Sequence, residues 1–383
     1  MRILFYENSA GFSNYTSKLA SFLVNMSENE VSYMTNEHNR NMQLIDKKVN
    51  LVIGLKEYNV EKKNTVKWAI NRIYVSLYNI LYRNKFCMEN KVDVVSIQST
   101  IPVIDRYFIH RLKRYSKVVY TVHDVIPPIK SRYYSKSSLK KVYKECDHLI
   151  VHTEGNKTQL KDLFGVNQKK ISVIPHGTDT ECPDLDKIEC RKRFGIDCSK
   201  TVILFYGMIR EQKGLDDLLH ALHNMSDVQL VIAGNTPYGE SFERYQKIID
   251  LYQIDCIRMV RFIPESDVDS LFCAADFVCL PYKYFYSQSG VFMQCIKYRK
   301  PVVVSDVSSF KDFLTDCMIG YICKPSDPKD LEVALKKMIE TIKKNGEELH
   351  SITYHLEIAA QKNSWRNVSM LYMDEFARSL GRN

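Results

Sequence analysis

The stretch LFYGMIREQKGLDDLL, residues 204–219, joins a strand-like run to a helical pattern through a short loop that contains two cations. The run Val202–Tyr206 is apolar, and the residues after the loop have leucines at helical spacing, namely Leu215, Leu218, Leu219 and Leu222. Arg210 and Lys213 lie in the loop itself. Open α/β sheets bind ligands at the carboxyl ends of their strands. The stretch therefore fits either a solvated loop or an anion-binding site.

Short apolar runs alternate with helical patterns along both halves of the chain, which is typical of parallel α/β sheets. In the first half we expect strands at Ile3–Tyr6, Leu51–Ile53, Val92–Ile97, Val118–Val122 and His148–Val151. In the second half we expect strands at Val202–Tyr206, Gln229–Ala233, Met259–Phe262, Phe277–Leu280 and Val302–Ser305. Residues 175–187, PHGTDTECPDLDK, lack periodicity and predict a linker. The fold class is therefore α/β, with two doubly wound domains facing a cleft.

The composition is that of a globular chain. Its 383 residues are 45% hydrophobic and 26% charged, which allows two or three domains with proper cores. We find no apolar run near the ~20 residues of a membrane span and no signal-peptide pattern. The eleven cysteines show neither CxxC nor Cys/His spacing, so they indicate a reducing cytoplasm rather than disulfides or zinc.

Positive charge is concentrated in the first half. Residues 1–180 contain 28 of the 54 Lys and Arg residues but only 16 of the 45 Asp and Glu residues. Such a basic half favours a polyanionic surface, either nucleic acid or anionic lipid. We find no nucleic-acid-binding motif, so anionic lipid is preferred.

Residues 62–86 have the pattern of a basic amphipathic helix. The apolar positions are Val66, Ile70, Ile73, Leu77 and Leu81, and the neighbouring aromatic positions are Tyr74, Tyr78 and Tyr82. Such a helix can lie on an anionic membrane, or it can pack on the sheet with a solvated basic face. A second basic stretch favours the membrane, and it contains Arg106, Arg111, Lys113, Arg114 and Lys117.

A second candidate anion site lies in LPYKYFYSQSGVFMQCIKYRKPVVVSD, residues 280–306. The pattern predicts a strand, a loop, a helix beginning near Ser289, and another strand. The helix start offers backbone N–H groups to an anion, although Ser289 also fits a plain N-cap. Together with Arg210 and Lys213, this loop suits a diphosphate. His123 follows an expected strand, where a ligand contact and a structural role are equally reasonable.

These motifs, taken in order, resemble the GT-B glycosyltransferases of glycosyltransferase family 4. The resemblance runs nearly end to end, through MRILFY, VVYTVHD, VIPHGTD, LFYGMIREQKGLDDLL, SQSGV, KPVVVSD and NSWRNVSMLY. It implies retaining transfer from a nucleotide-sugar. It also implies an acceptor-binding Rossmann-like domain over residues 1–177, with a C-terminal helix at about 364–383 packing back on it. A donor-binding Rossmann-like domain would cover residues 195–363.

The resemblance assigns roles residue by residue. Arg210 and Lys213 would hold the donor diphosphate and act in catalysis, together with His123 facing the donor sugar. The amides of Ser289, Gly290 and Val291 would meet the phosphates. Gly11 would lie near the diphosphate, and Ile263 would lie near the base.

The chain departs from the family pattern at its two usual glutamates, spaced E-x7-E. The corresponding positions hold Tyr286 and Gln294. Members with an S-G-V loop often lack these glutamates, so the departure does not imply an inactive enzyme. Gln294 is then expected at the ribose, and Gln288 at the donor sugar, whose identity stays open.

We therefore expect a metal-independent enzyme without a cofactor that uses a donor such as a UDP- or GDP-sugar. The expected acceptor is a glycan, lipid-linked through a polyprenyl carrier, in surface polysaccharide biosynthesis. The expected location is cytoplasmic, peripheral on the inner face of the plasma membrane, without nucleic acid as a partner. The alternatives are a non-catalytic GT-B binding module and a nucleotide-sugar 2-epimerase.

Overall fold

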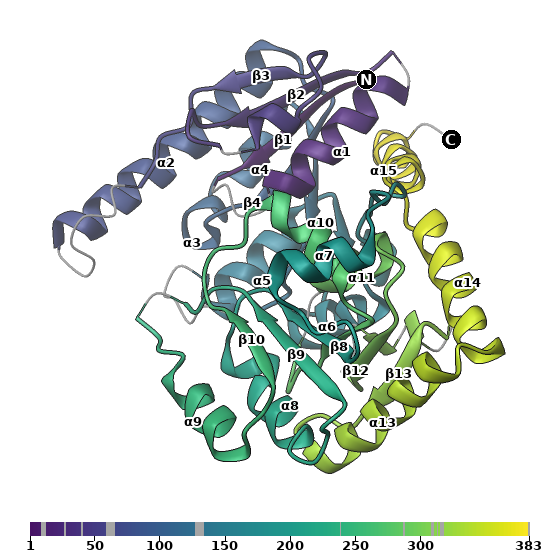
Figure 1. Ribbon diagram of the computed structural model, residues 1–383. Helices are drawn as coiled ribbons and strands as arrows, with labels where there is room; N and C mark the ends of the chain where they lie inside the picture. Colours follow the sequence, from purple (N-terminus) through teal and green to yellow (C-terminus); the bar gives the residue numbers. More distant parts are fainter. Residues whose placement is uncertain are drawn as a thin grey trace. The chain divides into compact units, whose positions relative to one another are not determined.

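The computed structural model describes residues 1–8, 13–26, 28–39, 41–58, 66–126, 134–237, 239–285, 288–307, 310–311, 313–314 and 318–381. The chain forms two compact units (Figure 1). The N-terminal unit contains Met1–Gly177 together with Trp365–Asn383, and the C-terminal unit contains Thr178–Ser364. Each unit is built on one parallel β-sheet.

The sheet of the N-terminal unit has seven strands in the order β3-β2-β1-β4-β5-β6-β7. The strands are β1 (Arg2–Glu7), β2 (Glu30–Thr35), β3 (Asn50–Ile53), β4 (Val94–Ser99), β5 (Lys117–Thr121), β6 (His148–Val151) and β7 (Ile171–Val173). Successive side chains of β1 enter opposite hydrophobic clusters, with Ile3 and Phe5 in one and Leu4 and Tyr6 in the other. A strand covered on both faces needs a continuous apolar run, which explains the sequence of β1.

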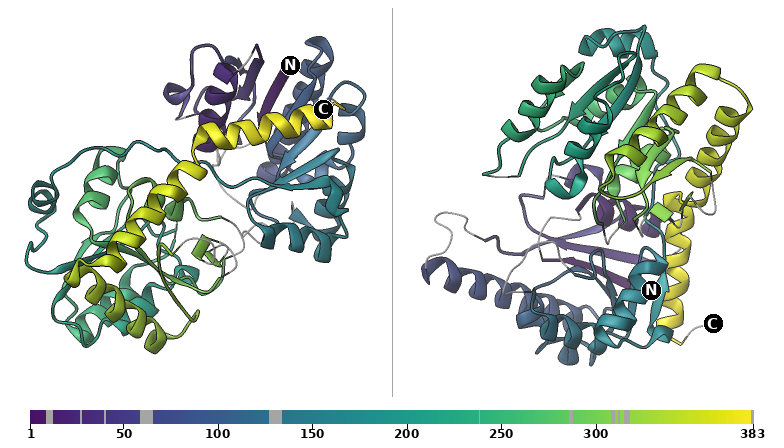
Figure 2. Two further views of the ribbon diagram at one scale, coloured as in Figure 1. Left: turned by 90° about the vertical axis from the view of Figure 1, so that its right-hand side faces the viewer. Right: turned by 90° about the horizontal axis from the view of Figure 1, so that it is seen from below.

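Helices cover both faces of this sheet. One face carries α1 (Ser13–Met26) and the C-terminal helix α15 (Trp365–Ser379), which pack against each other (Figure 2). The other face carries α2 (Val66–Glu89), α4 (Ile109–Leu112), α5 (Lys136–Glu145) and α6 (Glu154–Phe164). The short helix α3 (Pro102–Asp105) contacts α2 and α5. The terminal helix therefore completes the core of the N-terminal unit.

The sheet of the C-terminal unit has six strands in the order β10-β9-β8-β11-β12-β13. The strands are β8 (Thr201–Tyr206), β9 (Val228–Ala233), β10 (Cys256–Met259), β11 (Phe277–Leu280), β12 (Val302–Ser305) and β13 (Gly320–Cys323). One face packs against α7 (Lys187–Phe194), α10 (Glu265–Ala274), α11 (Gly290–Lys297) and α14 (Glu347–Lys362). The other packs against α8 (Leu215–Ala221), α9 (Glu243–Tyr252) and α13 (Pro328–Lys344).

The strand predicted at Met259–Phe262 is wrong in its bounds, because β10 ends at Met259. The downstream part of that apolar run is a loop, in which Phe262 is 69% exposed. β10 is an edge strand with half-buried and exposed residues, so its own sequence has a weak strand pattern. The short or partly polar strands β2, β7 and β13 were not predicted, whereas β6, β11 and β12 have the predicted bounds.

Candidate functional site

Both sheets reverse their strand order beside the first strand of the unit. In the C-terminal unit the reversal lies between β8 and β11, which are neighbours in the sheet but not in sequence. Ligands of open α/β sheets bind at such a switch point, at the carboxyl ends of the strands. The loop after β8 contains Arg210 and Lys213, and the loop after β11 leads to Ser289 and α11. The two stretches singled out in the sequence therefore lie on either side of one switch point.

The loops after β8 and β11 form one surface. The backbone N–H of Lys283 donates to the carbonyl of Gln212 at 2.9 Å. Gly214 has φ +68°, and a Cβ there would lie 1.9 Å from the Pro281 carbonyl oxygen. Gly207 similarly leaves only 3.0 Å between an added Cβ and Cγ2 of Val291. Glycines thus allow the two loops to approach more closely than side chains would permit.

Lys213 is held by aromatic rings. Its Nζ lies 3.6 Å from the ring centroid of Tyr282 and 4.6 Å from that of Phe285. No carboxylate among the described residues forms an ion pair with it. Burial, with a smaller contribution from the charge of Arg210, lowers the pKa of Lys213 to about 7. A nearby anion would stabilise the protonated, positively charged form of Lys213, so the site is suited to a phosphate.

Arg210 also lacks an ion-pair partner in the described part of the chain. Its Nε donates to the thioether sulfur of Met208 at 3.0 Å, which is a weak contact. The guanidinium can therefore still bind an oxyanion in a bidentate manner. Two such cations three residues apart repel each other, so the arrangement is stabilised when an anion binds both.

The start of α11 adds backbone donors at the same place. The hydroxyl of Ser289 accepts from the backbone N–H of Phe292 at 3.3 Å, which confirms the predicted helix start. Tyr282, the ring under Lys213, hydrogen-bonds that hydroxyl at 3.1 Å. The first backbone N–H groups of a helix have no acceptor within it, so those of Gly290 and Val291 can bind an anion. A Cβ on Gly290 would meet no atom within 4 Å, which shows open space at this turn.

Of the two glutamines expected at the donor, Gln294 lies in this helix and Gln288 lies just before it. The Gln294 Oε1 atom is buried and has no hydrogen-bond partner in the part of the chain that the structure describes, while the side-chain amide hydrogen-bonds Tyr206 at the end of β8. A buried acceptor without a partner is costly, so a hydrogen bond from a bound ligand would be favourable at this atom. The Nε2 atom of buried Gln288 lies 3.2 Å from the Met293 sulfur. The Ile263 side chain belongs to the hydrophobic core, so only the backbone of this residue is available for a ligand contact.

His123, in the N-terminal unit, has both ring nitrogens in internal contacts. Nδ1 lies 3.1 Å from Nε2 of His152, and Nε2 lies 3.0 Å from Oε1 of Gln98. His152 in turn bonds the Ile174 carbonyl through Nδ1 at 2.9 Å. Burial and the neighbouring histidines lower the pKa of His123, so the ring is neutral at pH 7. This geometry favours the structural alternative for His123, as a residue that orders the end of β5.

Two predicted positions, Gly11 and Tyr286, lie outside the described residues. The sequence analysis missed the rings of Tyr282 and Phe285 that hold Lys213. The aromatic run PYKYFY directly after β11 is the signal that could have identified them.

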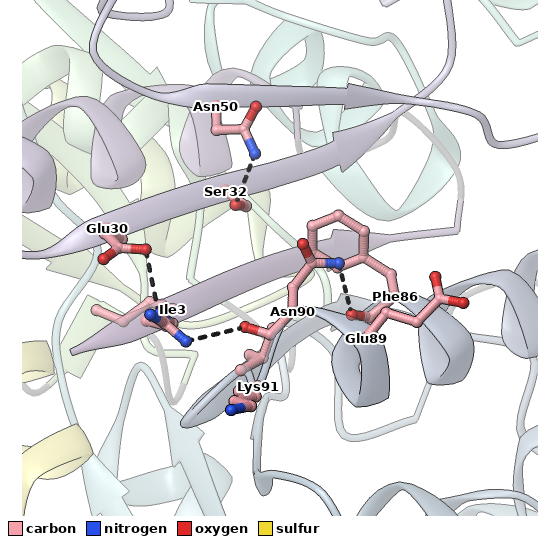
Figure 3. Close-up of a pocket in the computed structure, with 10 residues that line it drawn as sticks. Ile3, Glu30, Ser32, Asn50, Phe86, Glu89, Asn90 and Lys91 are labelled. Carbon is pink, nitrogen blue, oxygen red and sulfur yellow. Dashed lines mark hydrogen bonds and ion pairs between the residues drawn. The ribbon is translucent and has the colours of Figure 1, made fainter.

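A hollow of about 400 Å³ lies elsewhere, at the amino-terminal edge of the first sheet (Figure 3). Its polar groups bind one another, as Arg2 does with Glu30 at 3.2 Å and Asn50 with Ser32 at 3.2 Å. It faces away from the strand ends that hold ligands in such folds, so we assign no site to it. Across the described ranges there is no cluster of three or more metal-ligating residues. In the same ranges no helix has the length and apolarity to cross a bilayer.

Comparisons with known proteins agree with this architecture. Residues 186–352 match the family Glycosyl transferases group 1, and residues 11–182 match Glycosyltransferase Family 4. A D-inositol 3-phosphate glycosyltransferase of Mycobacterium sp. (strain KMS) is 29% identical over 197 residues, which are 50% of this chain. The aligned segment spans only 44% of that relative's length.

Solved structures match over almost the whole chain. A glycosyltransferase from Rickettsia africae ESF-5 has a TM-score of 0.79 at 14% identity, covering 100% of this chain and 99% of its own. The Anabaena protein HepE, solved in complex with UDP, has a TM-score of 0.75 at 14% identity, covering 99% and 100%. These likenesses show the fold. The two family matches, one on each half of the chain, show that it belongs to glycosyltransferase family 4, group 1, and the solved structures show that it has the GT-B fold.

Proposed function

We propose that this protein is a retaining glycosyltransferase that moves a sugar from a nucleoside diphosphate sugar to a glycan acceptor. The observation that carries the proposal is Lys213, a cation on two aromatic rings, without a carboxylate partner in the described chain, beside Arg210. The C-terminal unit would bind the donor and the N-terminal unit the acceptor.

Leaving-group stabilisation would be the main source of catalysis. When the bond between the anomeric carbon and the diphosphate breaks, negative charge develops on the phosphate oxygen. Arg210, Lys213 and the first N–H groups of α11 would stabilise that charge without reorganising. The acceptor hydroxyl would then attack the anomeric carbon from the face that the diphosphate leaves and give its proton to the departing phosphate oxygen. We propose that no metal is needed, so EDTA should leave the rate unchanged, whereas loss of activity with rescue by Mg²⁺ would contradict this.

The donor is proposed to be a UDP- or GDP-sugar. Gln294 would hydrogen-bond the ribose, the backbone at Ile263 would meet the base, and Gln288 would contact the sugar. HepE was solved with UDP and with UDP-glucose, which favours a uridine donor as the first to test.

The acceptor is proposed to be lipid-linked, in surface polysaccharide biosynthesis on the inner face of the plasma membrane. Support comes from the basic N-terminal half. WaaG, a glycosyltransferase described as involved in lipopolysaccharide biosynthesis, has a similar fold. That structure has a TM-score of 0.68 at 15% identity, covering 98% of this chain and 99% of its own, so it supports the fold alone.

The direct test is a product assay with UDP- and GDP-sugars and a short glycan acceptor. We expect glycosylated product and release of nucleoside diphosphate, both strongly reduced by Arg210→Ala. Conversion of the nucleotide-sugar to an epimer without transfer would identify a 2-epimerase. Donor binding with neither hydrolysis nor transfer across the panel would identify a non-catalytic binding module.

A further inference from the structure

The apolar residues predicted along α2 form an exposed stripe. The exposed fractions are 77% for Val66, 61% for Ile70, 52% for Ile73, 53% for Tyr74, 46% for Leu81 and 48% for Met88. We call these six residues the α2 stripe. At 100° per residue they fall within about 100° of the helix surface, so they share one face.

The buried face of α2 is a different one. It consists of Val75, Ser76, Asn79, Ile80, Arg83 and Cys87. Arg83 fixes this orientation, because its guanidinium makes two 2.8 Å hydrogen bonds to the Asp105 carboxylate, and both side chains are fully buried. The helix therefore cannot rotate the stripe into the core without breaking a buried ion pair.

The amino-terminal part of α2 belongs to none of the hydrophobic core clusters formed by the described residues. None of its first nine residues, 66–74, is buried. Figure 1 shows this part of the helix extending past the strands of its own unit. Helices with so little packing are marginally stable in water, and contiguous exposed apolar surface is typical of an interaction site.

Several cations lie beside the α2 stripe or on the helix packed next to it. Lys67 and Lys85 lie along one flank, and the Nζ atom of Lys56 lies 4.6 Å and 4.2 Å from the ring centroids of Tyr74 and Tyr78. Arg111 is exposed on α4, which packs beside α2. Against these charges α2 itself carries a single carboxylate, that of Glu89. A partner that binds this surface must therefore carry negative charge next to an apolar layer into which the α2 stripe can insert.

We propose that the α2 stripe inserts into the interface of an anionic phospholipid bilayer and holds the N-terminal unit on the membrane. Membrane binding would bring the enzyme to a lipid-linked acceptor, so this inference rests on the proposed function. Aromatic and basic side chains beside an apolar helix face are suited to this interface. A second copy of the chain fits less well, since pairing two stripes would bring their flanking cations together.

Vesicle flotation tests the proposal with the full-length protein. We expect flotation with vesicles of equal parts phosphatidylcholine and phosphatidylglycerol, and none with phosphatidylcholine alone. Ile70→Asp/Ile73→Asp should lower partitioning roughly tenfold or more, because two charges would enter the apolar layer. Val333→Asp is the matched control, since Val333 is 67% exposed on α13 of the other unit. It should float like the wild type.

Flotation of Ile70→Asp/Ile73→Asp at the wild-type level would overturn the proposal. So would a wild-type dimer that this variant makes monomeric while neither floats. Binding of UDP and transfer to a soluble acceptor should be unchanged in the variant. A wild type that floats with anionic vesicles but transfers no sugar would instead contradict the proposed function. The membrane-binding role of the α2 stripe would then still be supported.

Discussion

At the scale of the residue, Lys213 should make donor binding depend on pH. Its pKa is lowered to about 7, from 10.5, by burial and by Arg210. Below about pH 7 the buried charge of Lys213 lowers the free energy of unfolding of the unliganded protein. This destabilisation disappears as the pH rises toward 10.5. A bound diphosphate raises the pKa again, so binding above pH 7 takes up a proton. Affinity for UDP should therefore fall as the pH rises from 7 to 9.

Titration calorimetry at pH 8 in two buffers of different ionisation enthalpy measures this proton. We expect uptake that approaches about one proton per UDP bound, and none in Lys213→Met. The same UDP affinity at pH 7 and pH 9 in the wild type would refute the assignment.

Gly214 should not tolerate a side chain. Its φ is +68°, and a Cβ would lie 1.9 Å from the carbonyl oxygen of Pro281. Gly214→Ala should lower the free energy of unfolding by at least about 2 kcal/mol and weaken UDP binding, because the loops must separate. Gly346→Ala is the control, since a Cβ there meets no atom within 4 Å. Urea denaturation of both variants provides the comparison, and equal stabilities would contradict the geometry.

At the scale of the element, the Arg83–Asp105 pair should anchor α2. Both side chains are fully buried, and the hydroxyl of Thr100 also donates to Asp105 at 2.6 Å. Arg83→Leu should cost about 3 to 5 kcal/mol of unfolding free energy, because a buried carboxylate loses its partner. Lys85→Ala, two residues along the helix, removes only an exposed 3.7 Å ion pair with Glu89. It should change the melting temperature little. If Arg83→Leu and Lys85→Ala changed the stability equally, the claim that the Arg83–Asp105 pair anchors α2 would be refuted.

The strands that are buried at every position are the ones whose bounds the sequence predicted most accurately. β11 and β12 are buried at every position, and their apolar runs have the predicted bounds. β10 lies at a sheet edge, so the apolar residues after it, such as Phe262, were taken for the strand. In α2 the apolar face was recognised, but which face meets the core is decided by Arg83 and its partner, which lies in α3. Hydrophobic periodicity contains no such information.

At the scale of the whole molecule, the order of motifs predicted two Rossmann-like domains before any contact was known. The strand orders confirm them, because each sheet runs outward from its first strand in both directions. The candidate site was only partly predictable. Arg210, Lys213 and Ser289 could be named from loops after strands, whereas the support of Lys213 by Tyr282 and Phe285 depends on how two loops pack.

The central claim is that the strand ends of the C-terminal unit bind a nucleoside diphosphate. Calorimetry of UDP and GDP binding to the wild type, Arg210→Ala and Lys343→Ala tests it most directly. Lys343 is an exposed cation paired at 3.3 Å with Asp227, which precedes β9 at the opposite edge of the sheet. We predict that one nucleotide binds the wild type and Lys343→Ala alike, and binds Arg210→Ala at least about tenfold more weakly. If neither nucleotide binds, or if Arg210→Ala binds as tightly as the wild type, the claim is contradicted.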